Sequence, residues 1–106
     1  MSLVIGVFDG LSIMTSFFAG FTHTGNGVTC SDSGFLDLST AEECSGSDAV
    51  NYAKSFDGNA HYASVLWDFV HHKGCFMYDN GEMWFNTHAT GGRRSDSTNI
   101  CRKGNN

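Results

Sequence analysis

Four cysteines in a chain of 106 residues constrain this sequence more than any other feature. The chain has room for one small domain and one hydrophobic core. An even number of cysteines in so short a chain is typical of disulfide-bonded proteins of oxidising compartments. No two of the cysteines form a Cys-x-x-Cys pair, which argues against a zinc ribbon or thioredoxin-like redox chemistry. We therefore expect two structural disulfides.

The net charge argues against one large class of partner. The chain carries 6 Lys and Arg against 11 Asp and Glu, which gives a formal net charge of −5. A nucleic-acid-binding domain needs a basic surface to neutralise phosphates, so we expect no nucleic-acid partner. Most of the cations come late, as Arg93, Arg94, Arg102 and Lys103. We interpret them as a solvated surface, with a contact to lipid headgroups or to an acidic partner as the alternative.

The most apolar segment is residues 3–21, LVIGVFDGLSIMTSFFAGF. It is nearly as long as a transmembrane helix, but Asp9 lies near its middle, glycines weaken it as a helix, and no Lys or Arg flanks it. The basic stretch that opens a secretory signal is also missing, so no presequence is visible. Three interpretations stay open: an arm docked on a partner, a strand of the domain's own core, or a membrane span.

We favour the docked arm, because so much apolar surface is costly to expose to water. Residues 1–27 are then an apolar N-terminal arm with a Gly-rich linker, and residues 28–106 are a disulfide-stapled module. The expected partner-binding positions recur at helical spacing and are Val4, Val7, Phe8, Leu11, Met14, Phe17, Phe18 and Phe21.

A helix is predicted to begin at Ser39. Ser39 and Glu42 match the Ser-x-x-Glu pattern of a capping box, and acidic residues in the first turn suit the helix dipole. Gly46 is the weak position of this helix, and residues 57–59 (Asp-Gly-Asn) end it. One face carries apolar residues at helical spacing, namely Ala41, Cys44, Ala49, Tyr52, Ala53 and Phe56.

Two short β-rich segments flank a turn further along the chain. Residues 75–78 (CFMY) and 82–87 (EMWFNT) enclose Asp-Asn-Gly, and Asn-Gly in such a position is the strongest short-range signal of a hairpin. Residues 60–70 (AHYASVLWDFV) fit either a second helix or a strand, and residues 22–30 read as a linker and a turn. The predicted fold class is α+β, with one main helix packed on a short antiparallel sheet and the apolar arm outside it.

Three of the five histidines lie within residues 71–88. His71, His72, Cys75 and His88 are the candidates for a zinc site or a thiolate–imidazole pair. Adjacent histidines in a strand point to opposite faces, however, and no second Cys stands at ligand spacing. We therefore expect structural and surface histidines, with no metal, no cofactor and no catalytic residue.

The aromatic residues offer an alternative kind of site. A sugar-stacking platform with amide groups beside it would use Trp67, Trp84, Tyr62, Tyr78, Asn80 and Asn86. Both tryptophans are more simply explained as buried core residues, which is what we expect of them.

The order of the cysteines and their neighbours resembles a known module. It runs from Cys30 through STAEEC (39–44), KGC (73–75) and GEMWFN (81–86) to NICR (99–102). This pattern, over residues 28–103, resembles a cysteine-rich module of algae and other marine protists, although such modules carry Pro where this chain has His72. In style it is loosely similar to PAN and apple domains, in which a helix stapled to a small sheet serves binding rather than catalysis.

Four cysteines allow three pairings. Within the module that the resemblance indicates, we prefer Cys44–Cys75, which ties the helix to the hairpin, and Cys30–Cys101, which closes the ends of the module.

Three functions compete at this point. The first is a non-enzymatic accessory subunit that docks through its apolar arm on a larger membrane assembly; the resemblance implies the thylakoid lumen of an alga and a photosystem or antenna complex. The second is a secreted, lectin-like domain that binds carbohydrate or protein in the extracellular space. The third, which we rank last, is a small enzyme or metalloprotein built on the histidine-rich segment.

Overall fold

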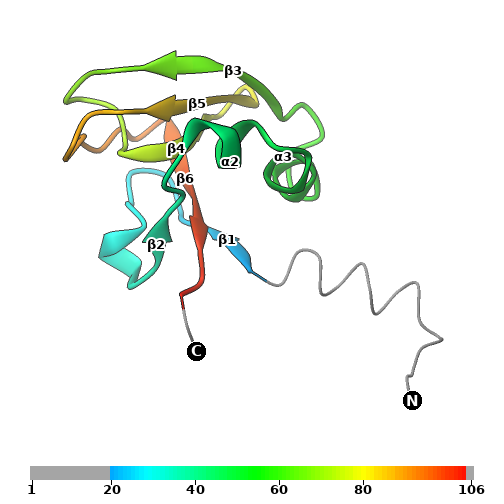
Figure 1. Cartoon of the computed structure of the whole chain (residues 1–106), viewed down its shortest axis with the longest axis horizontal. Helices are drawn as coiled ribbons and strands as arrows, with labels where there is room; N and C mark the ends of the chain where they lie inside the picture. Colours follow the sequence, from blue (N-terminus) through cyan, green and yellow to red (C-terminus); the bar gives the residue numbers. More distant parts are fainter. Residues whose placement is uncertain (1–19, 105–106) are drawn as a thin grey trace, which may run out of the picture.

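The fold is organised around its last strand, β6 (Ser97–Arg102). The computed structural model describes residues 20–104. The other strands are β1 (Phe21–His23), β2 (Leu36–Asp37), β3 (His61–Leu66), β4 (Gly74–Tyr78) and β5 (Glu82–Asn86). They form a six-stranded sheet in the order β1-β6-β4-β5-β3, with β2 also paired to β6 (Figure 1). The sheet and its helices confirm the predicted α+β class.

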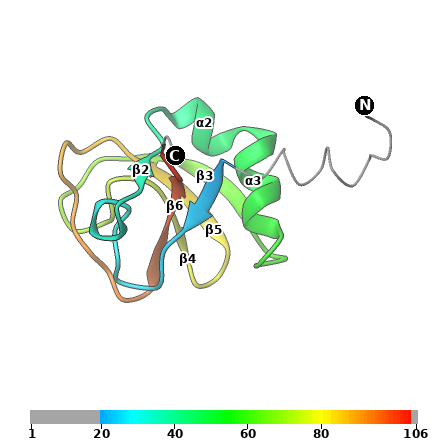
Figure 2. The same cartoon turned by 90° about the horizontal axis from the view of Figure 1, so that it is seen from below.

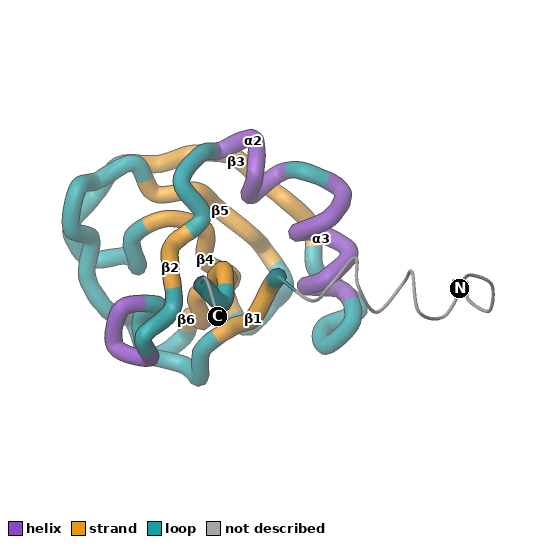
Figure 3. The backbone as a smooth tube through the Cα atoms, turned by 60° about the horizontal axis from the view of Figure 1, so that its bottom comes forward, coloured by secondary structure: helices purple, strands orange, loops and turns teal. Residues whose placement is uncertain are grey.

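Each half of β6 has its own partners. Its first half pairs antiparallel with β4, so that Phe76 stands opposite Asn99. Its second half lies between β1 and β2, and both Phe21 and Leu36 stand opposite Arg102 (Figure 3). Because neighbours flank it on both sides, five of its six residues are buried.

The predicted hairpin is confirmed. Strands β4 and β5 pair antiparallel, with Cys75 opposite Phe85 and Met77 opposite Met83. Gly81 at the turn has φ 94°, a conformation that favours glycine, and a Cβ there would lie 2.6 Å from the Asn59 carbonyl oxygen.

The ambiguous segment of residues 60–70 resolves as the strand β3. This strand pairs parallel with β5, so that Val65 lies beside Phe85. The sheet is therefore mixed, and the predicted short antiparallel sheet or hairpin is one part of it. Because β5 lies between β3 and β4 in the sheet, the loop that joins β3 to β4 must pass β5. This connection lets β3 run parallel to β5 while β4 and β5 form an antiparallel hairpin.

The predicted helix is two helices, α2 (Ala41–Ser45) and α3 (Ser47–Lys54), separated at Gly46 (Figure 2). Gly46 adopts φ −65° and ψ 155°, which is extended backbone, so it breaks the helix that the sequence pattern continues through it. The N-cap is Thr40 rather than Ser39. The Thr40 hydroxyl accepts the Glu43 amide N–H at 3.1 Å, and the Glu43 carboxylate accepts the Ser39 amide N–H at 2.7 Å.

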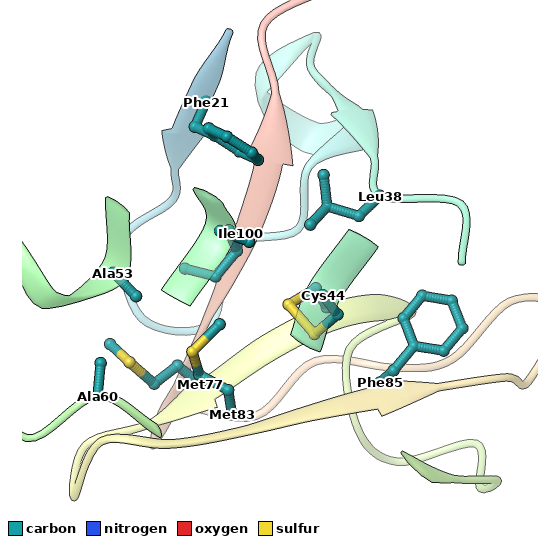
Figure 4. Packing of buried hydrophobic residues seen from close by; sticks show 11 residues of the cluster. Phe21, Leu38, Cys44, Ala53, Ala60, Met77, Met83, Phe85 and Ile100 are labelled. Carbon is teal, nitrogen blue, oxygen red and sulfur yellow. A yellow bond between two sulfur atoms is a disulfide. The ribbon is translucent and has the colours of Figure 1, made fainter. Parts of the chain in front are cut away.

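The hydrophobic core lies between these helices and one face of the sheet (Figure 4). Helix side chains such as Ala49 and Ala53 meet Met77, Met83 and Ile100 from the strands. Phe56, expected on the buried face of the helix, is exposed. The core is rich in small and flexible side chains, so it buries little apolar area. Disulfides supply part of the stability that this small core does not.

Both predicted disulfides are confirmed. Cys30 bonds Cys101 and so ties the loop after β1 to β6, with 5.8 Å between the two Cα atoms. Cys44 bonds Cys75 and so ties α2 to β4, with 5.4 Å between the two Cα atoms. Both bridges are fully buried, and they are consistent with an oxidising compartment.

The segment expected to be a linker begins with a strand instead. Phe21 is buried in the core from β1, where its ring stacks on Tyr52 with 5.6 Å between the centroids. The folded domain therefore starts before residue 28, and Phe21 contributes to the domain's own core rather than to a docking arm. The other expected docking positions, from Val4 to Phe18, lie outside the described residues. Within residues 20–104, no helix has both the length and the apolar character that a membrane span requires.

Candidate functional site

A row of exposed apolar side chains continues from the free edge of the sheet. Val65, Trp67 and Phe69 alternate along the chain, and their exposed fractions are 49%, 67% and 69%. Large apolar side chains exposed in one place on a small domain mark binding sites more often than single exposed residues do. We call Val65, Trp67 and Phe69 the edge row.

A groove of about 860 Å³ opens beside the edge row. Its apolar lining comes from Leu36 and Leu38 on one side and Phe85 on the other (Figure 4 shows Leu38 and Phe85). Its polar lining comes from Asp37, Ser39, Lys73, Asn86, His88 and Arg102. A mostly apolar hollow with a few polar groups at its rim is the usual form of a binding site.

The groove and the edge row are continuous. Val65 is the register partner of Phe85, which lines the groove. The Trp67 ring packs against the imidazole of His88, with 4.8 Å between the centroids, and His88 also lines the groove. The edge row and the groove therefore form one candidate binding surface.

The loop that carries Trp67 and Phe69 is held in place by a buried amide. The Asn86 side chain donates to the carbonyl oxygens of Asp68 and His71, each at 3.0 Å. Its own oxygen accepts the Asp68 amide N–H at 3.2 Å and the His88 amide N–H at 3.1 Å. The exposed rings thus stand on a fixed backbone, which lowers the entropic cost of binding through them.

A glycine pair lets a second loop support the first. A Cβ on Gly91 would lie 2.5 Å from the Lys73 amide nitrogen, and a Cβ on Gly92 would lie 2.5 Å from the Phe69 carbonyl oxygen. The Gly92 amide N–H donates to the His71 carbonyl oxygen at 2.7 Å. Only glycine allows the two backbones to lie this close, because any side chain at these two positions would clash.

Charges around the groove are largely neutralised by neighbours. The Lys73 ammonium lies 3.9 Å from Asp37, and burial raises the pKa of the Asp37 carboxyl despite that cation. The hydrogen bonds from Arg102 hold the pKa of Glu43 down at about 2. The late cations Arg93 and Arg94, expected to be a solvated surface, pair with Asp32 and Asp96 respectively.

An Asp-His-Tyr chain lies beside the site. The His71 Nδ1 atom is 2.6 Å from Asp68 and its Nε2 atom is 2.5 Å from the Tyr78 hydroxyl. This order is that of a hydrolase triad with a phenol in the place of the serine. Burial raises the pKa of Tyr78. We interpret the chain as a structural link between β4 and the loop that follows β3.

The four residues of the predicted zinc or thiolate alternative have separate roles. Cys75 is bonded to Cys44, so it offers no thiolate. His72 is fully buried, and its Nδ1 atom lies 3.0 Å from the Asn99 side-chain oxygen. The His88 Nδ1 atom accepts the amide N–H groups of Thr90 and Gly91. Among residues 20–104, no three His, Cys, Asp or Glu side chains are grouped so that they could hold a metal ion.

The aromatic residues of the predicted sugar platform take part in separate contacts. The Trp84 indole N–H donates to Glu82 at 3.0 Å, and Tyr78 binds His71. Tyr62 packs at the margin of the core, and Asn86 is buried. Of the four aromatic residues in this predicted platform, Trp67 is the strongly exposed one, so the expectation that it is a core residue is wrong.

Sequence reasoning missed the groove and most of the edge row. The alternation of Val65, Trp67 and Phe69 was a signal in the sequence for an edge strand with one apolar side. The groove had no such signal, because its walls come from segments about fifty residues apart that only the sheet brings together. Comparisons of the chain with protein-family models, with curated proteins and with solved structures find no match.

Proposed function

We propose that this protein is a non-catalytic interaction module, an accessory subunit whose stapled domain binds a partner protein through the edge row and the groove. The observation that carries the proposal is the exposure of Trp67 and Phe69 on a rigid backbone. Tryptophan is enriched among the residues that dominate protein–protein binding energies, and the centres of such interfaces are apolar with few charges.

The apolar segment of residues 3–18 adds a second contact to the proposal. Its sequence is too apolar to face water at low cost, so a larger assembly, in or on a membrane, is the proposed partner. The compartment follows from the resemblance: the thylakoid lumen of an alga, with a photosystem or antenna complex as the assembly. The extracellular space is the alternative oxidising compartment.

Site-specific photo-crosslinking in the native source tests the proposal. A photo-reactive amino acid at position 67 is expected to capture one defined polypeptide, because Trp67 lies in the proposed interface. The same amino acid at Ser33, an exposed residue of the 3-10 turn η1 (Ser31–Ser33), is the matched control and is expected to capture none. Equal capture at both positions, or capture of nothing at position 67 in intact cells, refutes the proposal.

Carbohydrate binding is the second candidate function. It is favoured by Trp67, whose exposed ring lies against His88 beside a groove with polar groups at its rim. Phe69 is equally exposed. A glycan array probed with the wild type and with Trp67→Ala distinguishes the two: Trp67-dependent binding to a glycan supports carbohydrate recognition.

A further inference from the structure

We propose that the partner supplies an extended segment with basic flanks, which adds to the free edge of β3 as a further strand. The inference rests on the proposed function and names the chemistry and conformation of the partner. Strand addition to an open sheet edge is a recurring mode of peptide recognition, in which main-chain hydrogen bonds give affinity and alternate side chains give specificity.

The edge of β3 is open for this pairing. Within the described sheet, β5 is the one neighbour of β3. The register between them shifts between Tyr62 and Ser64, and from Ser64 to Leu66 the pairing is regular. Hydrogen bonding continues past the strand, because the Thr87 amide N–H donates to the Leu66 carbonyl oxygen at 2.9 Å. The regular part of β3 therefore pairs with β5 on one side and with no described strand on the other.

The edge has few of the features that keep other sheet edges apart. Natural edge strands are commonly protected by Lys, by Pro or by an inward-facing charge. The sequence of β3, HYASVL, holds neither Pro nor any Asp, Glu, Lys or Arg. The register shift between Tyr62 and Ser64 is the one protective irregularity of the described strand, and it ends directly before Val65. An edge with so little protection, beside exposed apolar side chains, is unfavourable for a domain on its own. An added partner strand would cover both the edge and these side chains.

The spacing of the edge row fits an extended occupant. Val65 lies in β3 and Trp67 directly follows the strand, so an extended chain advances roughly 7 Å between them, whereas Phe69 lies in the bend beyond. An added strand places its own side chains on the same face at the same interval. Apolar residues at alternate positions of the partner would therefore contact Val65 and Trp67, and a helical partner has no such period.

The charges beside β3 select a basic partner. Glu82, which accepts the Trp84 indole N–H, is the register partner of His61, and Asp68, which is bonded to His71, follows the strand at its other end. Burial raises the pKa of Tyr62 on β3, and the Glu42 carboxylate raises it further. Of the 6 Lys and Arg in the chain, Lys73, Arg93, Arg94 and Arg102 are already in ion pairs. Lys or Arg on the flanks of the added segment would complement these carboxylates.

The same charges disfavour a second copy of this chain as the occupant. Two copies paired through β3 would bring Glu82 and Asp68 of one chain toward the carboxylates of the other, and the chain as a whole carries −5. Like charges across an interface oppose association. Dimerisation through β3 is therefore an outcome that contradicts the inference.

Selection from a random peptide library tests the inference directly. Peptides of about ten residues, a length that exceeds a typical strand, are displayed on phage and selected on the full disulfide-bonded chain at low salt. We expect enriched peptides with alternating Val, Ile or Phe and with Lys or Arg at their ends. Enrichment of acidic peptides, of helix-patterned peptides or of no peptide overturns the inference.

A synthetic peptide from the enriched set locates the added strand. Amide NMR of the labelled chain is expected to show shifts and slowed hydrogen exchange from Tyr62 to Asp68. Val65→Lys puts a charge of the wrong sign on the edge and should weaken binding about tenfold or more, which is about 1.4 kcal/mol. Ser33→Lys adds the same charge at an exposed site on η1 and should leave binding unchanged after its long-range effect is screened by salt.

The outcomes separate this inference from the proposed function. If position 67 captures a partner in cells but β3 shows no added protection, the module binds protein through its side chains alone and strand addition is wrong. If position 67 captures nothing, the proposed function fails whatever the peptides show. Self-association of the wild type that Val65→Lys abolishes would replace the basic partner with a second copy.

Discussion

Around β6, cross-links and hydrogen bonds reach the strand from both sides, whereas β3 is held from one side by β5. The β6 region contains one disulfide directly and a second on the adjacent β4, and its residues are buried. The β3 region has exposed apolar side chains and an open edge. A domain this small buries little apolar area, so its stability depends on the disulfides and hydrogen bonds near β6. With these in place, the domain stays folded although apolar side chains at β3 are exposed.

A buried asparagine shows how completely the β6 region is bonded. The Asn99 oxygen accepts the Cys30 amide N–H at 3.2 Å and faces His72 Nδ1 at 3.0 Å. Its nitrogen donates to the carbonyl oxygens of Lys73 at 3.0 Å and Cys75 at 2.9 Å. All four hydrogen-bonding positions of the amide are used, at the point where β6 changes partners.

The largest expected effect is the loss of the bridge at β6. The double variant Cys30→Ser/Cys101→Ser opens a bridge between residues 71 apart in sequence. The chain-entropy account gives a loss of about 4 kcal/mol in the free energy of unfolding, a large part of what a small domain has. Urea unfolding followed by tryptophan fluorescence measures it. A loss below about 1 kcal/mol would show that the comparison assigns too much stability to this bridge.

Removal of the buried amide is the next largest effect. Asn99→Leu keeps the approximate size of the side chain but leaves the carbonyl oxygens of Lys73 and Cys75 without it. Each buried polar group left without a partner costs about 1–3 kcal/mol, so we expect a loss of at least about 3 kcal/mol. Asn51→Leu, at an exposed position of α3, is the control and should change the unfolding midpoint little. Similar losses in both variants would contradict the role given to Asn99.

A smaller, pH-dependent effect is expected where α2 meets β6. Arg102 donates to the Glu43 carboxylate through Nε at 3.1 Å, and this bond holds the Glu43 pKa at about 2. A carboxyl pKa that folding lowers contributes stability above its ordinary value and loses it as the pH falls toward 2. Glu43→Gln should therefore cost roughly 0.5–1 kcal/mol at neutral pH, since the pair is partly exposed, and nothing near the folded pKa.

Denaturant unfolding across this pH range checks the prediction on Glu43. Glu42→Gln removes the adjacent exposed carboxylate and is the control. A difference between wild type and Glu43→Gln that is the same at neutral and at low pH would contradict the role of Arg102.

The smallest effect on stability is expected at the edge row. Trp67→Ala removes a ring that is 67% exposed, so the free energy of unfolding should change by about 0.5 kcal/mol or less. Phe76→Ala removes a fully buried ring of β4 and should lower the free energy of unfolding by about 3–5 kcal/mol, which is the reference for the loss of a core ring. Parallel thermal and urea unfolding of both variants sharpens the comparison. A large loss from Trp67→Ala would make it a structural residue and weaken its role in binding.

Local patterns made much of this fold predictable. The Asn-Gly turn is encoded in adjacent residues, and so is the helix start, although the cap falls one residue later at Thr40. The break at Gly46 was visible as a weak position, but its outcome depends on how α2 and α3 pack on the sheet. The parallel pairing of β3 with β5 was not predictable in this way, because it depends on the path of the loop across the sheet.

The candidate site was less predictable than the fold for the same reason. The histidines were predicted to be structural or surface residues, but their partners, such as Asn99 for His72 and the Thr90 amide for His88, were not predictable from the sequence. Trp67 was expected in the core because tryptophan is usually buried there. Its exposure follows from the position of β3 at the edge of the sheet, which only the full strand order reveals.

The placement of β6 in the sheet has a consequence for synthesis. The strand that β1, β2 and β4 all require is the last of the six to leave the ribosome. At roughly 5–20 residues per second, β1 waits several seconds or more for its pairing partner, and Cys30 waits as long for Cys101. By the end of this interval β3 and the hairpin are made, but the open edge of β3 has no finished domain behind it until β6 follows.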